Sequence, residues 1–106
     1  MQKFQGDKMT VTAMIIEKGD HVATCLSKVK KGDKVKLMHN GRTGKTIKSN
    51  SSIPYIHKIC ISPITKGEHC MKYGLSIGIA TKNIKIGDYI HVHNIESARG
   101  RGDLEA

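Results

Sequence analysis

The chain has 106 residues, with one Phe, three Tyr and no Trp, so its core must be built mainly from aliphatic side chains. This length is typical of one domain, and it is too short to enclose a deep active site within a single copy. The formal net charge of +9 fits a nucleic acid or a small anion such as a carboxylate or phosphate as partner. No run of about 18 apolar residues is present, which excludes a helical membrane span.

The first residues, MQKFQGDK, are polar and lack the apolar region of a signal peptide, so export is not indicated. We expect residues 1–9 to be flexible and a single domain to occupy residues 10–95. The three cysteines form no C-x-x-C pair, which disfavours a disulfide framework and a zinc knuckle. Free buried thiols are the simpler interpretation, and they favour a cytoplasmic protein.

A pattern of Gly followed by an acidic residue, flanked by apolar residues, recurs four times along the chain. The four pairs are Gly19-Asp20, Gly32-Asp33, Gly67-Glu68 and Gly87-Asp88. Irregular spacing excludes a solenoid. Each copy predicts a tight turn with Gly at positive φ and a strand after it. The acidic side chain is expected either to accept hydrogen bonds from nearby backbone amides or to face water.

Alternating apolar residues predict a mainly β protein with short strands, mostly of Ile and Val. The expected strands are residues 10–16, 21–26, 34–38, 45–48, 56–61, 69–72, 76–80 and 88–93. Short helical turns are expected at Ala23–Val29 and before Gly67 and Gly87. Residues 39–52 are rich in Gly, Ser and Asn and predict a long loop or flexible hairpin. The tail, residues 96–106, has no apolar periodicity and is expected to be disordered unless a partner orders it.

Lysines cluster between Lys28 and Lys36, but few aromatic residues are interleaved with them. Stacking on single-stranded bases therefore has little to use. The cluster is interpreted as a solvated strand–turn face in preference to a nucleic-acid groove, and a surface for an acidic partner remains open.

The most reactive polar side chains lie between His57 and Asn94. His91 and His93 have the i, i+2 spacing that places two imidazoles on one face of a strand, where they could share an ion or a substrate. Imidazole suits iron, zinc or manganese, but two ligands make a weak site. A third ligand could come from another histidine, from Glu68 or from another subunit. The alternative is an exposed polar edge strand. Lys72-Tyr73-Gly74 combines a cation, a phenol and a permissive glycine, which suits a carboxylate.

In order along the chain, these residues resemble one family. The motifs are His57-Lys58, Ile64-x-x-Gly67-Glu68, Lys72-Tyr73-Gly74, Ile77-Gly78-x-Ala80, Ile84-x-x-Gly87 and His91-x-His93-Asn94. Together they are similar to the SAF-type domain of the altronate and galactarate dehydratases, a group that includes sulfolactate sulfo-lyase. The stretch Gly19–Ala23 is similar to the opening strand of that domain, although His21 stands where the family commonly carries Asn.

The resemblance implies a β-clip fold, related to type III antifreeze domains, and a small subunit whose site is completed by a separate large catalytic chain. It also implies a divalent metal, with iron(II) expected, and a sugar-acid substrate. Alternatives are a sulfolactate sulfo-lyase subunit, a stand-alone carbohydrate- or anion-binding module, and a nucleic-acid-binding module. A homo-oligomer is also compatible.

The resemblance assigns roles to individual residues. The expected catalytic residues are His57, His91 and His93, and the expected substrate-binding residues are Lys58, Lys72, Tyr73, Gly74 and Asn94. The expected metal ligands are His21, His91 and His93, and the expected partner contacts are Arg99 and Arg101. In this interpretation the lysines neutralise the substrate carboxylate, and a histidine moves the proton next to it.

Overall fold

The computed structural model describes residues 10–97, and these contain strands and turns but no helix. None of the described segments is therefore a helix able to cross a membrane. The nine strands are β1 (Thr10–Ile15), β2 (Val22–Cys25), β3 (Lys34–His39), β4 (Arg42–Lys48), β5 (Lys58–Cys60), β6 (His69–Lys72), β7 (Leu75–Ala80), β8 (Tyr89–Ile90) and β9 (Ile95–Glu96). The prediction of a mainly β protein is confirmed.

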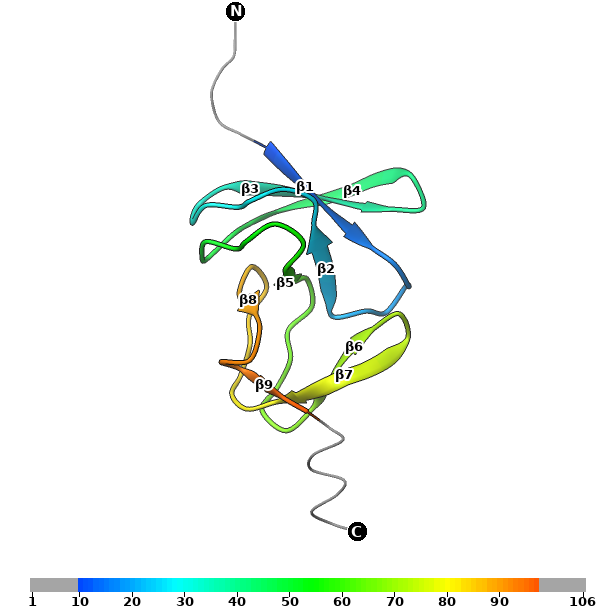
Figure 1. Cartoon of the computed structure of the whole chain (residues 1–106). Coiled ribbons are helices and arrows are strands. Elements are labelled where there is room, and N and C mark those ends of the chain that lie inside the picture. Colours follow the sequence, from blue (N-terminus) through cyan, green and yellow to red (C-terminus); the bar gives the residue numbers. More distant parts are fainter. Residues whose placement is uncertain (1–9, 98–106) are drawn as a thin grey trace, which may run out of the picture.

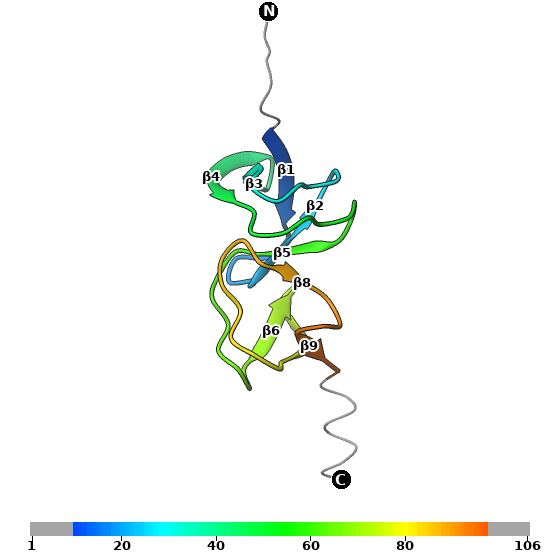
Figure 2. The same cartoon turned by 90° about the vertical axis from the view of Figure 1, so that its left-hand side faces the viewer.

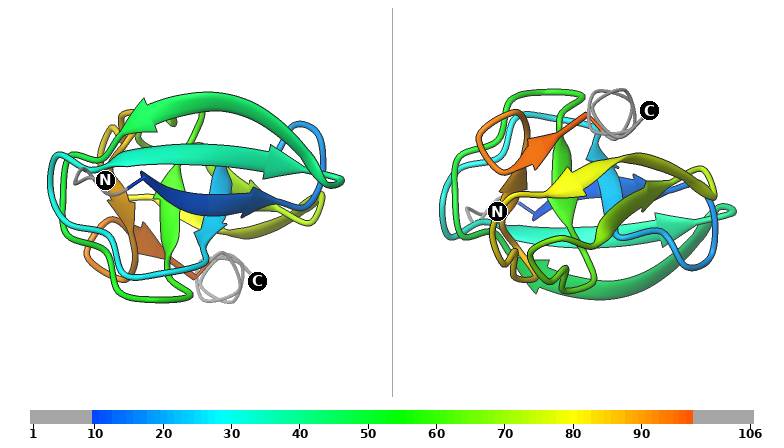
Figure 3. Two further views of the ribbon diagram at one scale, coloured as in Figure 1. Left: turned by 90° about the horizontal axis from the view of Figure 1, so that it is seen from above. Right: turned by 90° about the horizontal axis from the view of Figure 1, so that it is seen from below.

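The strands form two sheets, and each sheet occupies one end of the molecule (Figure 1). Six strands pair in the order β4-β3-β1-β2-β5-β8, and three pair in the order β6-β7-β9. Figure 2 shows β1, β3 and β4 in one half, β6 and β9 in the other, and β5 and β8 between them. Seen from above in Figure 3, β1, β3 and β4 lie side by side. The two sheets therefore meet near β5 and β8.

Two aliphatic clusters fill the interior, as expected from the scarcity of aromatic residues. One lies under the six-stranded sheet and includes Val11, Val35, Leu37 and Ile59. The other joins the two sheets and consists of Val22, Cys60, Ile64, Cys70, Ala80, Ile84 and Ile90. Alternation along the strands produces this division, because every second residue of a strand faces the same side. The second cluster forms the base on which the candidate site is built.

The Gly–acid repeat forms four copies of one turn, which confirms its predicted role. The glycines have nearly equal positive φ values of 95°, 92°, 93° and 96°, in the order Gly19, Gly32, Gly67 and Gly87. In each copy the backbone N–H three residues before the acidic residue donates to its carboxylate, over 3.2, 2.9, 2.7 and 2.9 Å in chain order. The acidic residue's own N–H donates back to the carbonyl of that earlier residue. Glycine permits the turn, and the acid satisfies an amide that the turn leaves open.

Several expectations about local structure are wrong. The segments expected to contain helical turns are strand, bend or hydrogen-bonded turn, because reciprocal acid–backbone bonds close the turns near Gly67 and Gly87. For residues 39–52 the hairpin alternative is confirmed and the long loop is not: β3 and β4 pair antiparallel, and β4 begins at Arg42 after a turn at Asn40-Gly41 where both residues have positive φ. Strand β8 ends at Ile90 rather than at residue 93. The short β9, Ile95–Glu96, was not expected.

Candidate functional site

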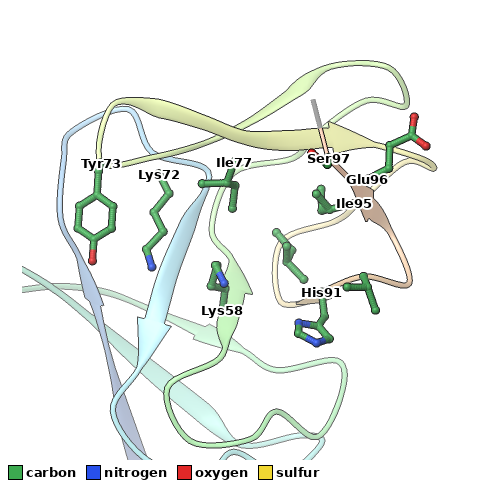
Figure 4. Close-up of a pocket in the computed structure, with 10 residues that line it drawn as sticks. Lys58, Lys72, Tyr73, Ile77, His91, Ile95, Glu96 and Ser97 are labelled. Carbon is green, nitrogen blue, oxygen red and sulfur yellow. The ribbon is translucent and has the colours of Figure 1, made fainter. Parts of the chain in front are cut away.

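A cavity of about 440 Å³ opens where the two sheets meet (Figure 4). Its polar lining includes Lys58 from β5, Lys72 at the end of β6, Tyr73 from the following turn and His91 after β8. The rest of the lining is Ile77, Ile90, Val92, Ile95, Glu96 and Ser97. An apolar wall with two ammonium groups beside it suits a small organic anion, because the wall excludes water and the lysines supply the countercharge.

The charge of Lys72 acts on Lys58 at this cavity. Burial lowers the pKa of Lys58 below its ordinary value of 10.5, and the positive charge of Lys72 lowers this pKa further; Cys70 acts weakly in the opposite direction. Lys72 also lies over the ring of Tyr73, with its Nζ 4.7 Å from the ring centroid. An anion placed between the two ammonium groups would relieve their repulsion. The electrostatics therefore favour a carboxylate or a similar anion at this position.

Three histidines and Tyr89 form an aromatic cluster beside the cavity. The Tyr89 hydroxyl lies 2.7 Å from Nδ1 of His57, within hydrogen-bonding distance. The rings of His57 and His91 have centroids 4.9 Å apart, and Tyr89 stacks on His91 at 5.6 Å with planes 9° apart. The ring of His93 also packs against Tyr89, with the two ring centroids 5.3 Å apart. His57 thus lies next to the cavity through His91, although it does not line it.

His91 and His93 do not share a strand face, contrary to the sequence prediction, because they belong to a turn after β8. Asn94 closes this turn: its Oδ1 accepts from the His91 N–H at 3.0 Å, and its Nδ2 donates to the Tyr89 carbonyl at 2.9 Å. Asn94 is only 4% exposed. Its amide is therefore committed to the backbone, so the geometry favours a structural role over the expected substrate contact.

Tyr73 and Gly74 form the tight turn between β6 and β7, both with positive φ. Their backbone N–H groups donate to the carboxylate of Asp20, at 3.0 and 3.1 Å. These two amides are thus occupied by a carboxylate of this chain, and the expectation that the segment binds a substrate carboxylate rests on the side chains of Lys72 and Tyr73. The Lys72 ammonium remains directed at the cavity (Figure 4).

His21 does not join the other histidines. It lies level with Ile61 at one end of β5, where the Ile61 N–H donates to the His21 carbonyl, whereas His91 lies level with His57 at the other end. Four steps along the extended chain, from His57 to Ile61, separate these levels, about 13 Å at 3.3 Å per residue. Nδ1 of His21 instead accepts from the Met71 N–H at 2.9 Å.

Among residues 10–97 no group of three His, Cys, Asp or Glu side chains is arranged to hold a metal ion. Imidazole donors suit iron(II), but a stable site needs more ligands than the adjacent rings of His57 and His91 supply. The described part of this chain therefore does not form the expected iron site by itself.

Four expected site residues come together at the cavity: Lys58, Lys72, Tyr73 and His91. His57 adjoins them, whereas His21, His93, Gly74 and Asn94 have other contacts, and the expected partner residues Arg99 and Arg101 lie outside the described residues. The sequence prediction missed Tyr89 and the role of Asp20. The Gly–acid repeat was a signal for Asp20, but nothing in the repeat identifies which copy reaches a distant turn.

Comparison with known proteins identifies the same family as the motifs. Residues 11–98 match the family model described as "Altronate/galactarate dehydratase SAF domain". The chain is 34% identical over 82 residues to altronate dehydratase from Bacillus subtilis (strain 168), a match covering 77% of this chain and 16% of that protein. It is 32% identical over 75 residues to altronate dehydratase from Escherichia coli (strain K12), covering 71% and 14%.

A third relative is (2R)-sulfolactate sulfo-lyase subunit alpha from Chromohalobacter salexigens, 35% identical over 48 residues, which are 45% of this chain and 51% of that protein. The matches thus span about one sixth or less of the two dehydratases and about half of the sulfo-lyase subunit.

Proposed function

The chain belongs to the altronate/galactarate dehydratase SAF domain family, and from that premise we propose that it is the small subunit of a hydroxy-acid lyase. In this proposal it holds the substrate's carboxylate in a site completed by a large catalytic chain. One observation carries the proposal: Lys58 and Lys72 lie on one cavity with an apolar wall, and the charge of Lys72 adds to the burial that lowers the pKa of Lys58.

The chemistry of dehydration explains what the lysines would do. Removing the proton next to a carboxylate places additional negative charge on that carboxylate before the β-hydroxyl leaves. Two ammonium groups beside an apolar wall stabilise this developing charge more strongly than water does. His91, at the edge of the same cavity, is the histidine placed to move a proton, and His57 with Tyr89 supports its ring. Besides His91 and the two lysines, the titratable side chains that the described residues place on the cavity are Tyr73 and Glu96.

Relatives support a separate small subunit. The 48 matched residues are 51% of the sulfo-lyase alpha subunit, so that protein is similar in length to this chain and is named as a subunit. The altronate dehydratases, in contrast, extend far beyond the matched region. We therefore propose a large partner chain, with Arg99 and Arg101 as its contacts. Assembly into a homo-oligomer is also compatible with this arrangement.

An iron(II) site in the assembly would take most of its ligands from the large chain. Of the histidines among the described residues, His91 is the one that lines the cavity, so it would be the ligand from this chain. The iron would supply Lewis-acid assistance to the leaving hydroxyl. The cellular location we propose is the cytoplasm, because Cys25, Cys60 and Cys70 are free and buried.

A sulfo-lyase acting on sulfolactate is the second candidate, favoured by the matching size of the alpha subunit. A third is a stand-alone anion-binding module, which would bind a hydroxy acid without any large chain. Both use the same lysine cavity, so they differ in what completes the site and in the leaving group.

Co-expression with a candidate large chain, sought in the neighbouring open reading frames, tests the proposal, with D-altronate and (2R)-sulfolactate as substrates. We expect lyase activity that neither chain shows alone. Lys58→Gln and Lys72→Gln should each lower kcat/KM by about 10- to 100-fold, since a hydrogen bond to a charged group contributes roughly 1.5–3 kcal/mol. Lys66→Gln is the matched control, because Lys66 is exposed and does not line the cavity.

Lyase activity of the large chain alone, unchanged by adding this subunit, would contradict the proposal. Hydroxy-acid binding by this chain without any activity in the mixture would favour the stand-alone module.

A further inference from the structure

We infer that Asp20 is a positioning residue of the anion cavity: it holds the β6–β7 turn that presents Lys72 and Tyr73. This inference rests on the proposed function, because it assigns the cavity its anion-binding role. Asp20 is 4% exposed, although carboxylates are seldom so buried. Such burial requires compensation by hydrogen bonds.

Three backbone amides compensate the Asp20 carboxylate. Oδ2 accepts from Glu17 at 3.2 Å, within its own turn, and from Tyr73 at 3.0 Å. Oδ1 accepts from Gly74 at 3.1 Å. Two of the three donors thus come from a turn more than fifty residues along the chain.

The other three acids of the repeat provide an internal comparison. The carboxylates of Asp33 and Glu68 each accept from the amide of their own turn and from no distant backbone amide of the part of the chain that the structure describes. Asp88 accepts in the same way and also accepts from the Asn50 side chain at 2.9 Å. Of the four copies, Asp20 is the one whose carboxylate binds the backbone of another turn. The shared turn does not explain its extra bonds.

The β6–β7 turn needs such a partner. In a two-residue hairpin turn with positive φ at both positions, the amides of the two turn residues lie outside the strand ladder. The β3–β4 turn at Asn40-Gly41 has the same signature, with φ values of 54° and 76° against 58° and 74° at Tyr73-Gly74. No side chain in the described residues accepts from the Asn40 or Gly41 amide. Within residues 10–97 this hairpin turn thus occurs once with a side-chain acceptor for its amides, at Tyr73-Gly74, and once without, at Asn40-Gly41.

His21 adds a second point of attachment. Its N–H donates to the Met71 carbonyl at 3.0 Å, and its Nδ1 accepts from the Met71 N–H at 2.9 Å. Lys72 lies between Met71 and Tyr73, so both of its neighbours are fixed by the Asp20–His21 pair. The position of the Lys72 ammonium relative to Lys58 consequently depends on this attachment. Asp20 and His21 thus affect the position of Lys72 at the cavity, although neither residue lines the cavity.

Amide hydrogen exchange of the full-length chain tests the role of Asp20 without any substitution. We expect the Tyr73 and Gly74 amides to exchange at least tenfold more slowly, relative to their intrinsic rates, than those of Asn40 and Gly41. Equal protection of the two turns would overturn the inference. This outcome requires no ligand and no large chain, so it is independent of whether the lyase proposal holds.

Asp20→Asn, compared with Asp33→Asn, tests the consequence for the cavity. The asparagine keeps the shape but loses acceptor capacity toward the three amides, so exchange at Tyr73 and Gly74 should accelerate. With Lys72 less constrained, the pKa of Lys58 should rise toward its ordinary value. The dissociation constant for D-altronate should increase several-fold.

Asp33→Asn should leave both cavity readouts unchanged, since its carboxylate bonds only its own turn. A folded Asp20→Asn protein with wild-type Lys58 pKa and wild-type exchange at Tyr73 and Gly74 would overturn the inference. If the variant does not fold, the exchange comparison of the two turns in the wild-type chain still decides the question.

Discussion

Lys58 is the residue on which the electrostatic account depends. Burial and then Lys72 lower its pKa, so its charged form is disfavoured in the folded protein. The unfolded chain therefore binds more protons than the folded chain between the lowered pKa and 10.5, and stability from this group rises with pH across that window. Below the lowered pKa, where Lys58 is charged in both states, the folded protein bears the full free-energy cost of keeping it charged.

Replacing Lys72 by Gln removes one cause of this shift. We expect the pKa of Lys58 to rise in Lys72→Gln, followed through the side-chain resonances of Lys58 by NMR. Because the charged form of Lys58 is then less disfavoured, removing the charge of Lys72 should raise the free energy of unfolding while Lys58 is protonated. This gain over the wild type should shrink as the pH approaches 10.5 and Lys58 loses its proton. An unchanged Lys58 pKa would show that the two ammonium groups do not interact. Lys66→Gln, which removes an exposed lysine, is the control.

Tyr89 is the second residue with a specific expectation. Tyr89→Phe keeps the stack on His91 but removes the hydroxyl 2.7 Å from Nδ1 of His57. The loss should be about 0.5–1.5 kcal/mol of unfolding free energy. The ¹⁵N shifts of His57 should report a changed mixture of tautomers. Tyr55→Phe is the matched control, because Tyr55 is 63% exposed. Identical His57 spectra in the wild type and Tyr89→Phe would contradict the contact.

Some site residues could be predicted from the sequence and others could not. Lys58, Lys72, Tyr73 and His91 lie within recognisable motifs, and they meet at the cavity. Asp20 and Tyr89 act through partners 53 and 32 residues away, so no local pattern indicates their contacts. The turn-closing bonds of Asn94 were not predicted, because a polar side chain in a motif looks the same in sequence whether it contacts a ligand or closes a turn.

At the scale of elements, the Gly–acid turns carry the chain between strands, and they differ in how tightly they are packed. A Cβ at Gly87 would lie 2.4 Å from the Lys48 carbonyl oxygen and 3.1 Å from Asn50 Nδ2. A Cβ at Gly32 would meet nothing within 4 Å, although the φ values of 96° and 92° are nearly equal. A side chain at either position would therefore suffer similar backbone strain, but only at Gly87 would its Cβ also collide with neighbouring atoms.

Alanine substitutions separate these two terms. Gly32→Ala should cost about 1–3 kcal/mol of unfolding free energy through backbone strain alone. Gly87→Ala should cost at least 1–2 kcal/mol more, since the Lys48 backbone must move. Urea unfolding measures both values. Equal losses would contradict the close approach of residues 48 and 87.

The sequence predicted most strand positions, because apolar alternation marks the strands and the Gly–acid turns mark several of the points where one strand ends and another begins. It missed β9, which has two residues and pairs with Ile79 and Ala80 of β7. Two residues cannot show a periodicity. It also extended β8 through His93, because alternating His and Val resemble a strand unless the reciprocal bonds of Asn94 are known. Tertiary hydrogen bonds, rather than local preference, set these boundaries.

At the scale of the whole molecule, the three cysteines report on the integrity of both cores. Burial raises the pKa of Cys25 and Cys70 to about 11 and that of Cys60 to about 12, from 9.0. A thiolate is the reactive form, so its population at neutral pH falls at least roughly 100-fold. The thiols should therefore become reactive only when the folded cores open.

A thiol-reactive disulfide such as Ellman's reagent tests this expectation. At pH 8 the native chain should react slowly, and denaturant should release three rapidly reacting thiols, one for each cysteine of the sequence. Rapid native reaction of one thiol, at the rate of free cysteine, would contradict the packing of that side chain.

The central claim is that an organic anion binds between Lys58 and Lys72. NMR titration of the full-length chain with D-altronate, at several pH values, tests it most directly. The account predicts that the pKa of Lys58 rises on binding, because an anion offsets the repulsion from Lys72, and that the resonances of Tyr73 and His91 shift with it. An unchanged Lys58 pKa at saturation, with shifts confined to the separate cavity near His39 and Arg42, would contradict it.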